Sequence, residues 1–250
     1  MPFTLAHPAA ILPFTKCKRH FHLPAMILGS MAPDFEYFLR GRPSGIYGHT
    51  LWGMFLLDLP LVAVVYLIGK NVIWKSLAAY LPRFMQEIEP HKFRGRIFSF
   101  LIFCYSALIG IFTHIAWDSF THADGAMVKR IAVLKNAVHL FHFEIPVYKL
   151  LQHGSTLLGL TVIVCFFLRA YRHQEKTGSD ELSLKRKCSL WLMFAGMILL
   201  IFAVWGLVSA VSITDYGTWV IRLGDSAIVS LLLLSLLVKL RFAIKRRLTK

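Results

Sequence analysis

The sequence predicts an all-α fold: a polytopic membrane helical bundle with about five transmembrane helices and an outward-facing polar site formed with the N-terminal segment. Composition is the first observation. Of the 250 residues, 56% are hydrophobic and 16% are charged, whereas soluble domains contain about 25% charged residues. The mean hydropathy of +0.60 agrees with a membrane protein. Long apolar stretches and an uneven distribution of Lys and Arg are the other two observations.

The N-terminal segment is expected to be part of the folded protein. MPFTLAHPAAILPF has no basic residue before its apolar part and contains three prolines, unlike a cleavable signal peptide. The four cysteines are widely scattered and form no CxxC pair. This spacing argues against a thiolate metal site and against a disulfide framework.

Five stretches then follow that are long enough to cross a hydrocarbon core, which takes about 20 apolar residues. They lie near residues 51–69, 97–117, 155–171, 189–211 and 220–240. The first contains Asp58 and Pro60, the third is short, and the fourth has the clearest pattern. Because the backbone in lipid has to satisfy its own hydrogen bonds, all five are expected to be helices.

The basic residues predict the orientation of these spans. Cytoplasmic loops are enriched in Lys and Arg. Loops 70–96 and 172–188 and the tail from Lys239 contain 17 of the 28 Lys and Arg residues, whereas the opposite side contains nine. We therefore expect the N-terminus to lie outside and the C-terminus to lie in the cytoplasm.

The same pattern suggests a division of the chain into three parts. Residues 1–171 are expected to form a membrane domain that carries the polar site. Residues 172–188 are expected to form a cytoplasmic loop, and residues 189–250 the last two spans and a basic tail.

Polar residues suited to metal binding collect on the side with few Lys and Arg residues. The N-terminal segment contains His7, then Asp34 and Glu36 in GSMAPDFEYF, then His49 just before the first span. Pro33 disfavours helical geometry at the residue before it. We therefore expect a turn or a broken helix that presents Asp34.

The second span ends in GIFTHIAWDSFTH, which contains His114, Asp118 and His122 at intervals of four residues. Residues four apart lie on one face of a helix, so His114 and Asp118 are placed to chelate one ion, as the histidines of HExxH do. His122 continues this face only if the helix persists. His153 precedes the third span. The alternative to a metal site is that His114 and Asp118, at the end of the helix, only hydrogen-bond to each other. Ionisable groups at membrane depth nevertheless usually mark functional sites.

Five motifs occur in order between Met1 and about Gly159: MPFTLAHPAAILP, GSMAPDFEYF, GHTLWGMFLLDLP, THIAWDSFTH and YKLLQHGSTLLG. With these motifs the chain resembles a bacterial membrane family known only as domain-of-unknown-function family 4184. This resemblance implies a membrane protein and no particular activity.

More distantly, the chain resembles the predicted membrane-bound metal-dependent hydrolases. The resemblance rests on the order of an early His, a Pro-Asp element, a second His and a later HxxxD. Those hydrolases are similar in turn to zinc-dependent phospholipase C. Carried over by position, the resemblance implies metal ligands at His7, Asp34, His49, His114 and Asp118, with His122 and His153 as further ligands.

From the motifs and the resemblance we expect a metal-dependent hydrolase, phosphodiesterase-like, that acts on a phosphoester of a lipid or lipid-linked substrate at the outer membrane surface. The expected cofactor is a divalent metal, zinc first, with Mn or Fe as alternatives. Glu36 and Asp118 are the candidate catalytic residues. The candidate ligands of substrate phosphate are Arg40, Arg42, Lys129 and Arg130.

Membrane lipids are the expected partners. Nucleic acid is not expected, because no basic stripe alternates with exposed aromatic residues.

Two other functions stay open. One is a transporter or ion pathway along Asp58, His114, Asp118, Arg222 and Asp225. It is less favoured because transport sites usually lie at the midplane between repeats. The other is a membrane scaffold without enzymatic activity.

Overall fold

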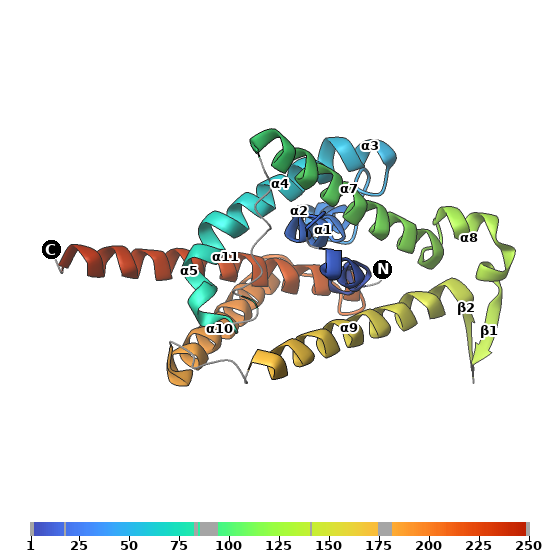
Figure 1. Ribbon diagram of the computed structural model, residues 1–250. Coiled ribbons are helices and arrows are strands. Elements are labelled where there is room, and N and C mark those ends of the chain that lie inside the picture. Colours follow the sequence, from blue (N-terminus) through green and yellow to red (C-terminus); the bar gives the residue numbers. More distant parts are fainter. Residues whose placement is uncertain are drawn as a thin grey trace. The chain divides into compact units, whose positions relative to one another are not determined.

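The computed structural model in Figure 1 describes residues 3–17, 19–82, 85, 95–140, 142–174 and 182–248. The predicted helical fold is confirmed, because five helical stretches are long and apolar enough to cross a membrane. Parts of the two predicted cytoplasmic loops, residues 83–84, 86–94 and 175–181, lie outside the described residues.

A group of short N-terminal helices precedes the long apolar helices. The N-terminal group consists of a 3₁₀ helix (Thr4–Cys17), α1 (Leu23–Gly29), a 3₁₀ turn (Ala32–Asp34) and α2 (Phe35–Arg40). The first apolar stretch runs through α3 (Leu51–Gly53), a π-helical segment (Met54–Asp58), α4 (Leu59–Ile68), a second π-helical segment (Gly69–Trp74), α5 (Lys75–Leu77) and a 3₁₀ turn (Ala78–Tyr80). The other long helices are α7 (Arg96–Thr121), α9 (Val147–Gln174), α10 (Leu184–Val208) and α11 (Tyr216–Leu248).

The first apolar stretch differs from the prediction in its length. It continues to Tyr80, so the predicted loop 70–96 begins as helix. Pro60 does not end it. Proline lacks an N–H and its ring crowds the carbonyl four residues earlier, and the widened π-helical turn that ends at Asp58 lies just before it. A π-bulge is a usual way for a helix to absorb such a mismatch.

The segment between α7 and α9 contains the one feature that the all-α prediction left out. After α8 (Ala126–Arg130) and a 3₁₀ turn (Ala132–Lys135), strands β1 (Ala137–Leu140) and β2 (Phe143–Pro146) form an antiparallel hairpin. The alternation of apolar and polar residues in AVHL and FEIP is typical of strands. This hairpin leads directly into α9.

The chain divides into two compact units, which are described separately. The first contains Met1–Phe35, Ile46–Ala63 and Pro90–Ala170, and the second contains Glu36–Gly45, Val64–Glu89 and Tyr171–Lys250. The division at residues 171 and 188 that the sequence suggested stays a prediction.

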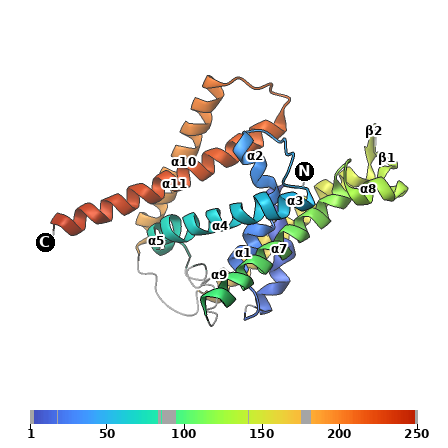
Figure 2. The same cartoon turned by 90° about the horizontal axis from the view of Figure 1, so that it is seen from above.

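In the first unit, α1 packs lengthwise on α7 (Figure 2). Their buried core contains Ala25, Ala32, Met54, Val62, Ala107 and Ile111. Glycines allow the close approach: a Cβ on Gly110 would lie 2.2 Å from the Met26 carbonyl oxygen, and a Cβ on Gly29 would lie 2.3 Å from the Ala107 carbonyl oxygen. Small residues at such contacts are typical of helix packing in membranes.

In the second unit, α10 packs on α11 around Leu77, Leu190, Leu234 and Val238. The buried Arg222 donates hydrogen bonds to the carbonyl and hydroxyl oxygens of Ser209 at 2.6 and 2.9 Å. It also lies over the ring of Trp205, 5.2 Å from the ring centroid. The guanidinium therefore joins Ser209, at the end of α10, to α11.

Gly110→Ala is expected to destabilise the protein, because the new methyl group meets backbone atoms that cannot rotate away. Overpacking of this kind costs about 1–3 kcal/mol. Gly154→Ala in α9 is the matched control, since its Cβ meets nothing within 4 Å. The thermal unfolding midpoint of the purified protein measures the difference. Equal midpoints for the two variants would show that α1 and α7 are not packed this closely.

Candidate metal centre

His114 and Asp118 lie one turn apart on the last part of α7, as their spacing predicted. Both are buried, and His114 Nε2 lies 3.3 Å from Asp118 Oδ2. The helix ends at Thr121, and His122 caps it in an extended conformation. His122 nevertheless stays beside Asp118, with its Nδ1 3.6 Å from Asp118 Oδ2.

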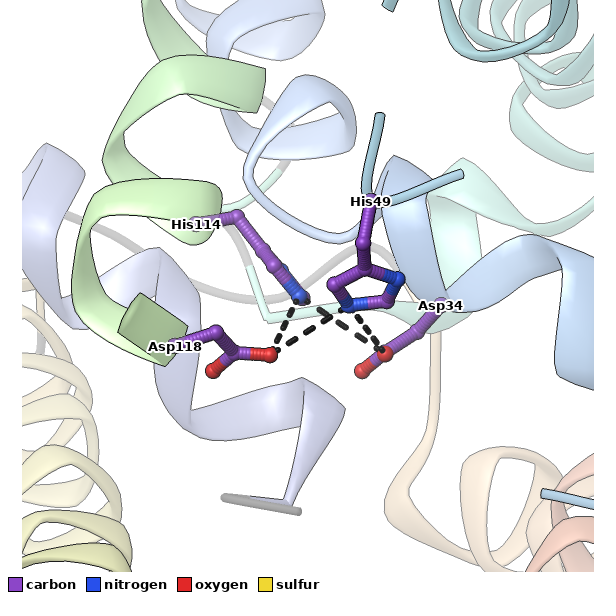
Figure 3. A group of neighbouring side chains, drawn as sticks. All are labelled: Asp34, His49, His114 and Asp118. Atoms are coloured by element: carbon purple, nitrogen blue, oxygen red, sulfur yellow. Dashed lines mark ion pairs between the residues drawn. The ribbon is translucent and has the colours of Figure 1, made fainter. Parts of the chain in front are cut away.

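Two turns of the N-terminal segment bring Asp34 and His49 to this pair (Figure 3). Asp34 ends the 3₁₀ turn that separates α1 from α2, so the predicted break at Pro33 is confirmed. The loop with His49 can approach because residue 48 is glycine: a Cβ there would lie 2.4 Å from the Pro33 carbonyl oxygen. His49 Nε2 then lies 3.8 Å from Asp34 Oδ1 and 3.3 Å from Asp118 Oδ2.

One atom from each of Asp34, His49, His114 and Asp118 lies within 4.8 Å of the other three. His114 Nε2 is 3.6 Å from Asp34 Oδ1. A tetrahedral ion with bonds of about 2.0–2.2 Å separates its ligand atoms by about 3.3–3.6 Å. The closest contacts in the group have this separation, so these four residues could hold a metal ion.

Contacts from outside the group orient two of its ligand atoms. His114 Nδ1 lies 2.8 Å from the carbonyl oxygen of Ser30, which can only accept, so Nδ1 carries the proton. This leaves Nε2, which faces the two carboxylates, with its lone pair free for an ion. The buried hydroxyl of Thr4 donates to Asp34 Oδ2 at 2.6 Å and leaves Oδ1 turned toward the histidines.

His7 lies against the same group from the 3₁₀ helix. Its ring stacks on the ring of His114 with centroids 3.8 Å apart, and its Nε2 is 3.6 Å from Asp118 Oδ1. Burial lowers the pKa of His7 from 6.5 to about 3. His7 is therefore neutral at pH 7, which is the state that binds a metal ion.

Several buried atoms of the cluster have no hydrogen-bond partner among the described residues. They are both ring nitrogens of His7, Asp34 Oδ1, His114 Nε2, both carboxylate oxygens of Asp118 and His122 Nε2. Burial also raises the pKa of the Asp34 carboxyl group. Unpaired buried polar atoms are costly, and a cation among them would bind the free lone pairs of the histidines and stabilise the carboxylates.

Two histidines of the cluster are partly exposed, and its other members are buried. The side chains of His114, Asp34 and Asp118 are 0%, 1% and 6% exposed, whereas those of His49 and His122 are 30% and 27% exposed. Solvent therefore reaches the cluster at His49 and His122.

The other candidate residues do not join this cluster. Glu36 is ion-paired with Arg40 at 2.7 Å in the second unit. Lys129 lies 3.7 Å from Asp124, and His153 is exposed on α9. Arg42 and Arg130 are exposed. Their predicted roles stay predictions.

Sequence reasoning missed Thr4 and Ser30. Thr4 lies three residues before His7, close enough in sequence to suggest a second residue directed at the same site. Ser30 acts through its backbone carbonyl, and no side-chain pattern could reveal that contact.

A family model described as a domain of unknown function (DUF4184) matches residues 1–237. The chain belongs to this family. The match covers all the motifs on which the family resemblance rested, and also most of the last two spans of this DUF4184 protein. A search of curated proteins and a search of solved structures each gave no significant match. The more distant similarity to metal-dependent hydrolases therefore stays a hypothesis.

Proposed function

We propose that this DUF4184 protein is a membrane-embedded metal-dependent hydrolase that acts on a phosphoester of a lipid or lipid-linked substrate at the outer membrane surface. The observation that supports it most is the convergence of Asp34, His49, His114 and Asp118 at the end of a membrane-spanning helix. Groups placed there can meet a phosphoester in the lipid headgroup layer, whereas a site at the midplane would favour transport.

Zinc is the proposed ion. Two neutral imidazoles and two carboxylates are ligands that zinc accepts, and ligand separations of 3.3–3.8 Å suit its tetrahedral preference. Mn and Fe are the alternatives, because they accept the same ligand types. A bound divalent ion supplies Lewis-acid chemistry, since it polarises a phosphoryl oxygen and makes water more acidic.

His7 and His122 are proposed as additional ligands. Asp118 Oδ2 contacts His49 and His114, while Asp118 Oδ1 faces His7. Asp118 would therefore hold bound metal with histidines on both of its oxygens. The stacked ring of His7 would also support the ring of His114.

Metal analysis and a hydrolysis assay on the same purified protein test this function. We expect stoichiometric divalent metal and chelator-sensitive hydrolysis of a phospholipid or polyprenyl phosphoester in vesicles. His114→Ala should abolish both, and His142→Ala, at an exposed histidine that was not a candidate ligand, should change neither. A folded wild-type protein that binds no metal when dialysed against zinc would contradict the proposed function.

Thr4→Val is expected to weaken metal binding while the protein stays folded. The substitution keeps the shape of the side chain but removes the hydroxyl that donates to Asp34 Oδ2. Loss of such an outer contact usually costs about 10–100-fold in metal affinity. Competition with a chromophoric chelator measures the affinity, and Thr15→Val, whose hydroxyl bonds only to the Leu12 carbonyl, is the control.

The proposed location is the bacterial inner membrane, with the N-terminus and the metal centre outside and the C-terminus in the cytoplasm. This orientation follows from the excess of Lys and Arg in loops 70–96 and 172–188 and in the tail from Lys239. Reporters fused after residues 80, 180 and 250 should all report the cytoplasm. An external signal after residue 250 would reverse the orientation and, with it, the side from which substrate arrives.

A further inference from the structure

The hairpin between α7 and α9 has one apolar face and one polar face. In its register Val138 pairs with Ile145, and His139 pairs with Glu144. Directly paired residues share a face, and so do residues two apart along a strand. Val138, Ile145 and Phe143 therefore form one face, and the exposed ion pair of His139 and Glu144 lies on the other.

The apolar face of the hairpin is left uncovered. Phe143 is 69% exposed and Val138 is 36% exposed. In the segment just before the hairpin, Val133 is 62% exposed and Ile131 is 40% exposed. An isolated two-stranded hairpin is only marginally stable in water. This face accordingly needs a partner.

The connections of the hairpin indicate where that partner lies. The chain from His122 to Pro146 joins two membrane-spanning helices, so it emerges at one surface of the bilayer whichever way the protein is oriented. Strand β2 ends at Pro146 and α9 begins at Val147, with no linker between them. In Figure 1 the hairpin projects from the start of α9. The apolar side chains therefore lie on the same side of the bilayer as the start of α9.

The charges around the hairpin favour an anionic surface. Of the six charged residues between positions 122 and 149, four are basic, and Lys129, Arg130 and Lys135 are exposed beside the hairpin. Basic residues next to apolar ones are typical of segments that lie in the interface of anionic bilayers. The unpaired edges of the two strands exclude a position deep in the hydrocarbon.

We propose that the hairpin face formed by Val138, Phe143 and Ile145 inserts into the headgroup layer of an anionic lipid bilayer, with Lys129, Arg130 and Lys135 bound to lipid phosphate. The hairpin thereby acts as an interfacial anchor that fixes the end of α7, and the metal-binding residues on it, at the membrane surface. This proposal depends on the hairpin's own face and charges, and it would stand if the metal centre had another function.

A fluorescent probe placed at two neighbouring positions tests the proposal in the full-length protein. The four native cysteines are first replaced by Ser, and the probe is attached to Phe143→Cys or Glu144→Cys. The two positions are matched, because Phe143 is 69% exposed and the Glu144 side chain is 71% exposed, but they lie on opposite faces. The protein is reconstituted in vesicles of phosphatidylcholine with or without phosphatidylglycerol.

We expect spin-labelled lipid to quench the probe at position 143 at least about twofold more than the probe at 144, as for a segment inserted on one face. Iodide in the buffer should show the reverse preference. The difference should be larger with phosphatidylglycerol, and replacing Lys129, Arg130 and Lys135 by Gln should remove that increase. Equal iodide quenching at both positions would place the face in water and overturn the proposal. Protection of position 143 from both quenchers would overturn it too, because a second copy of the chain would then cover the face.

Discussion

Asp118→Asn is expected to remove the bound metal and to abolish hydrolysis, because Asp118 is the residue around which the other ligands gather. Four histidine nitrogens lie 3.3–3.6 Å from its carboxylate oxygens, from His7, His49, His114 and His122. An amide has nearly the same shape but lacks the negative charge, and it presents N–H donors where the ion needs a lone pair. The loss should exceed the 10–100-fold that outer-shell substitutions typically cause.

The control for this variant is Asp124→Asn, six residues further along. The Asp124 side chain is 99% exposed, and among the described residues it is ion-paired with the exposed Lys129 at 3.7 Å. Neutralising it should leave metal content and activity unchanged. Metal analysis after gel filtration distinguishes the two variants, and retention of the full metal content in Asp118→Asn would contradict the central role of this carboxylate.

The pair on α7 could be predicted from the sequence because its geometry is local. A spacing of four residues in a helix places His114 and Asp118 on one face, whatever the rest of the chain does. The break at Pro33 is also local. The apolar stretches were recognisable for the same reason, since lipid leaves the backbone few alternatives to a helix.

The assembly of the cluster depends on contacts between distant residues, which spacing does not encode. Asp34 and His49 were candidates because they lay on the same predicted side of the membrane, and the structure brings both to α7. His153 was a candidate for the same reason, yet it is exposed on α9. A shared side of the membrane reduces the number of candidate ligands. Which of them meet depends on how the backbone segments pack, as in the close approaches at Gly48 and Gly110.

The β1–β2 hairpin could not be predicted from the sequence for a different reason. AVHL and FEIP alternate between apolar and polar residues, which is a strand pattern, but each is only four residues long. Between two long apolar helices, such short segments carry little weight against a helical prediction. Their register, and hence the apolar face, becomes clear only once the two strands are paired.

Removal of the metal is expected to lower the stability of the protein markedly. Without a cation, the buried carboxylates of Asp34 and Asp118 remain close together, and several atoms around them find no hydrogen-bond partner in the part of the chain that the structure describes. An ion that binds only the folded state contributes about 4 kcal/mol when its concentration is 1,000 times its Kd. For a chain of this length this corresponds to a fall of about 10 °C in the thermal unfolding midpoint after chelation.

Zinc added back should restore the midpoint, and Asp118→Asn should melt at the same temperature with and without chelator, since it has no ion to lose. The comparison separates two explanations for the buried polar cluster. If the histidines and carboxylates only form hydrogen bonds with one another, the cluster is structural. The wild-type protein would then have the same thermal unfolding midpoint with and without zinc. A midpoint that falls in the wild type and not in Asp118→Asn requires an ion held by Asp118, and the residues that could hold this ion come from both the N-terminal turns and α7.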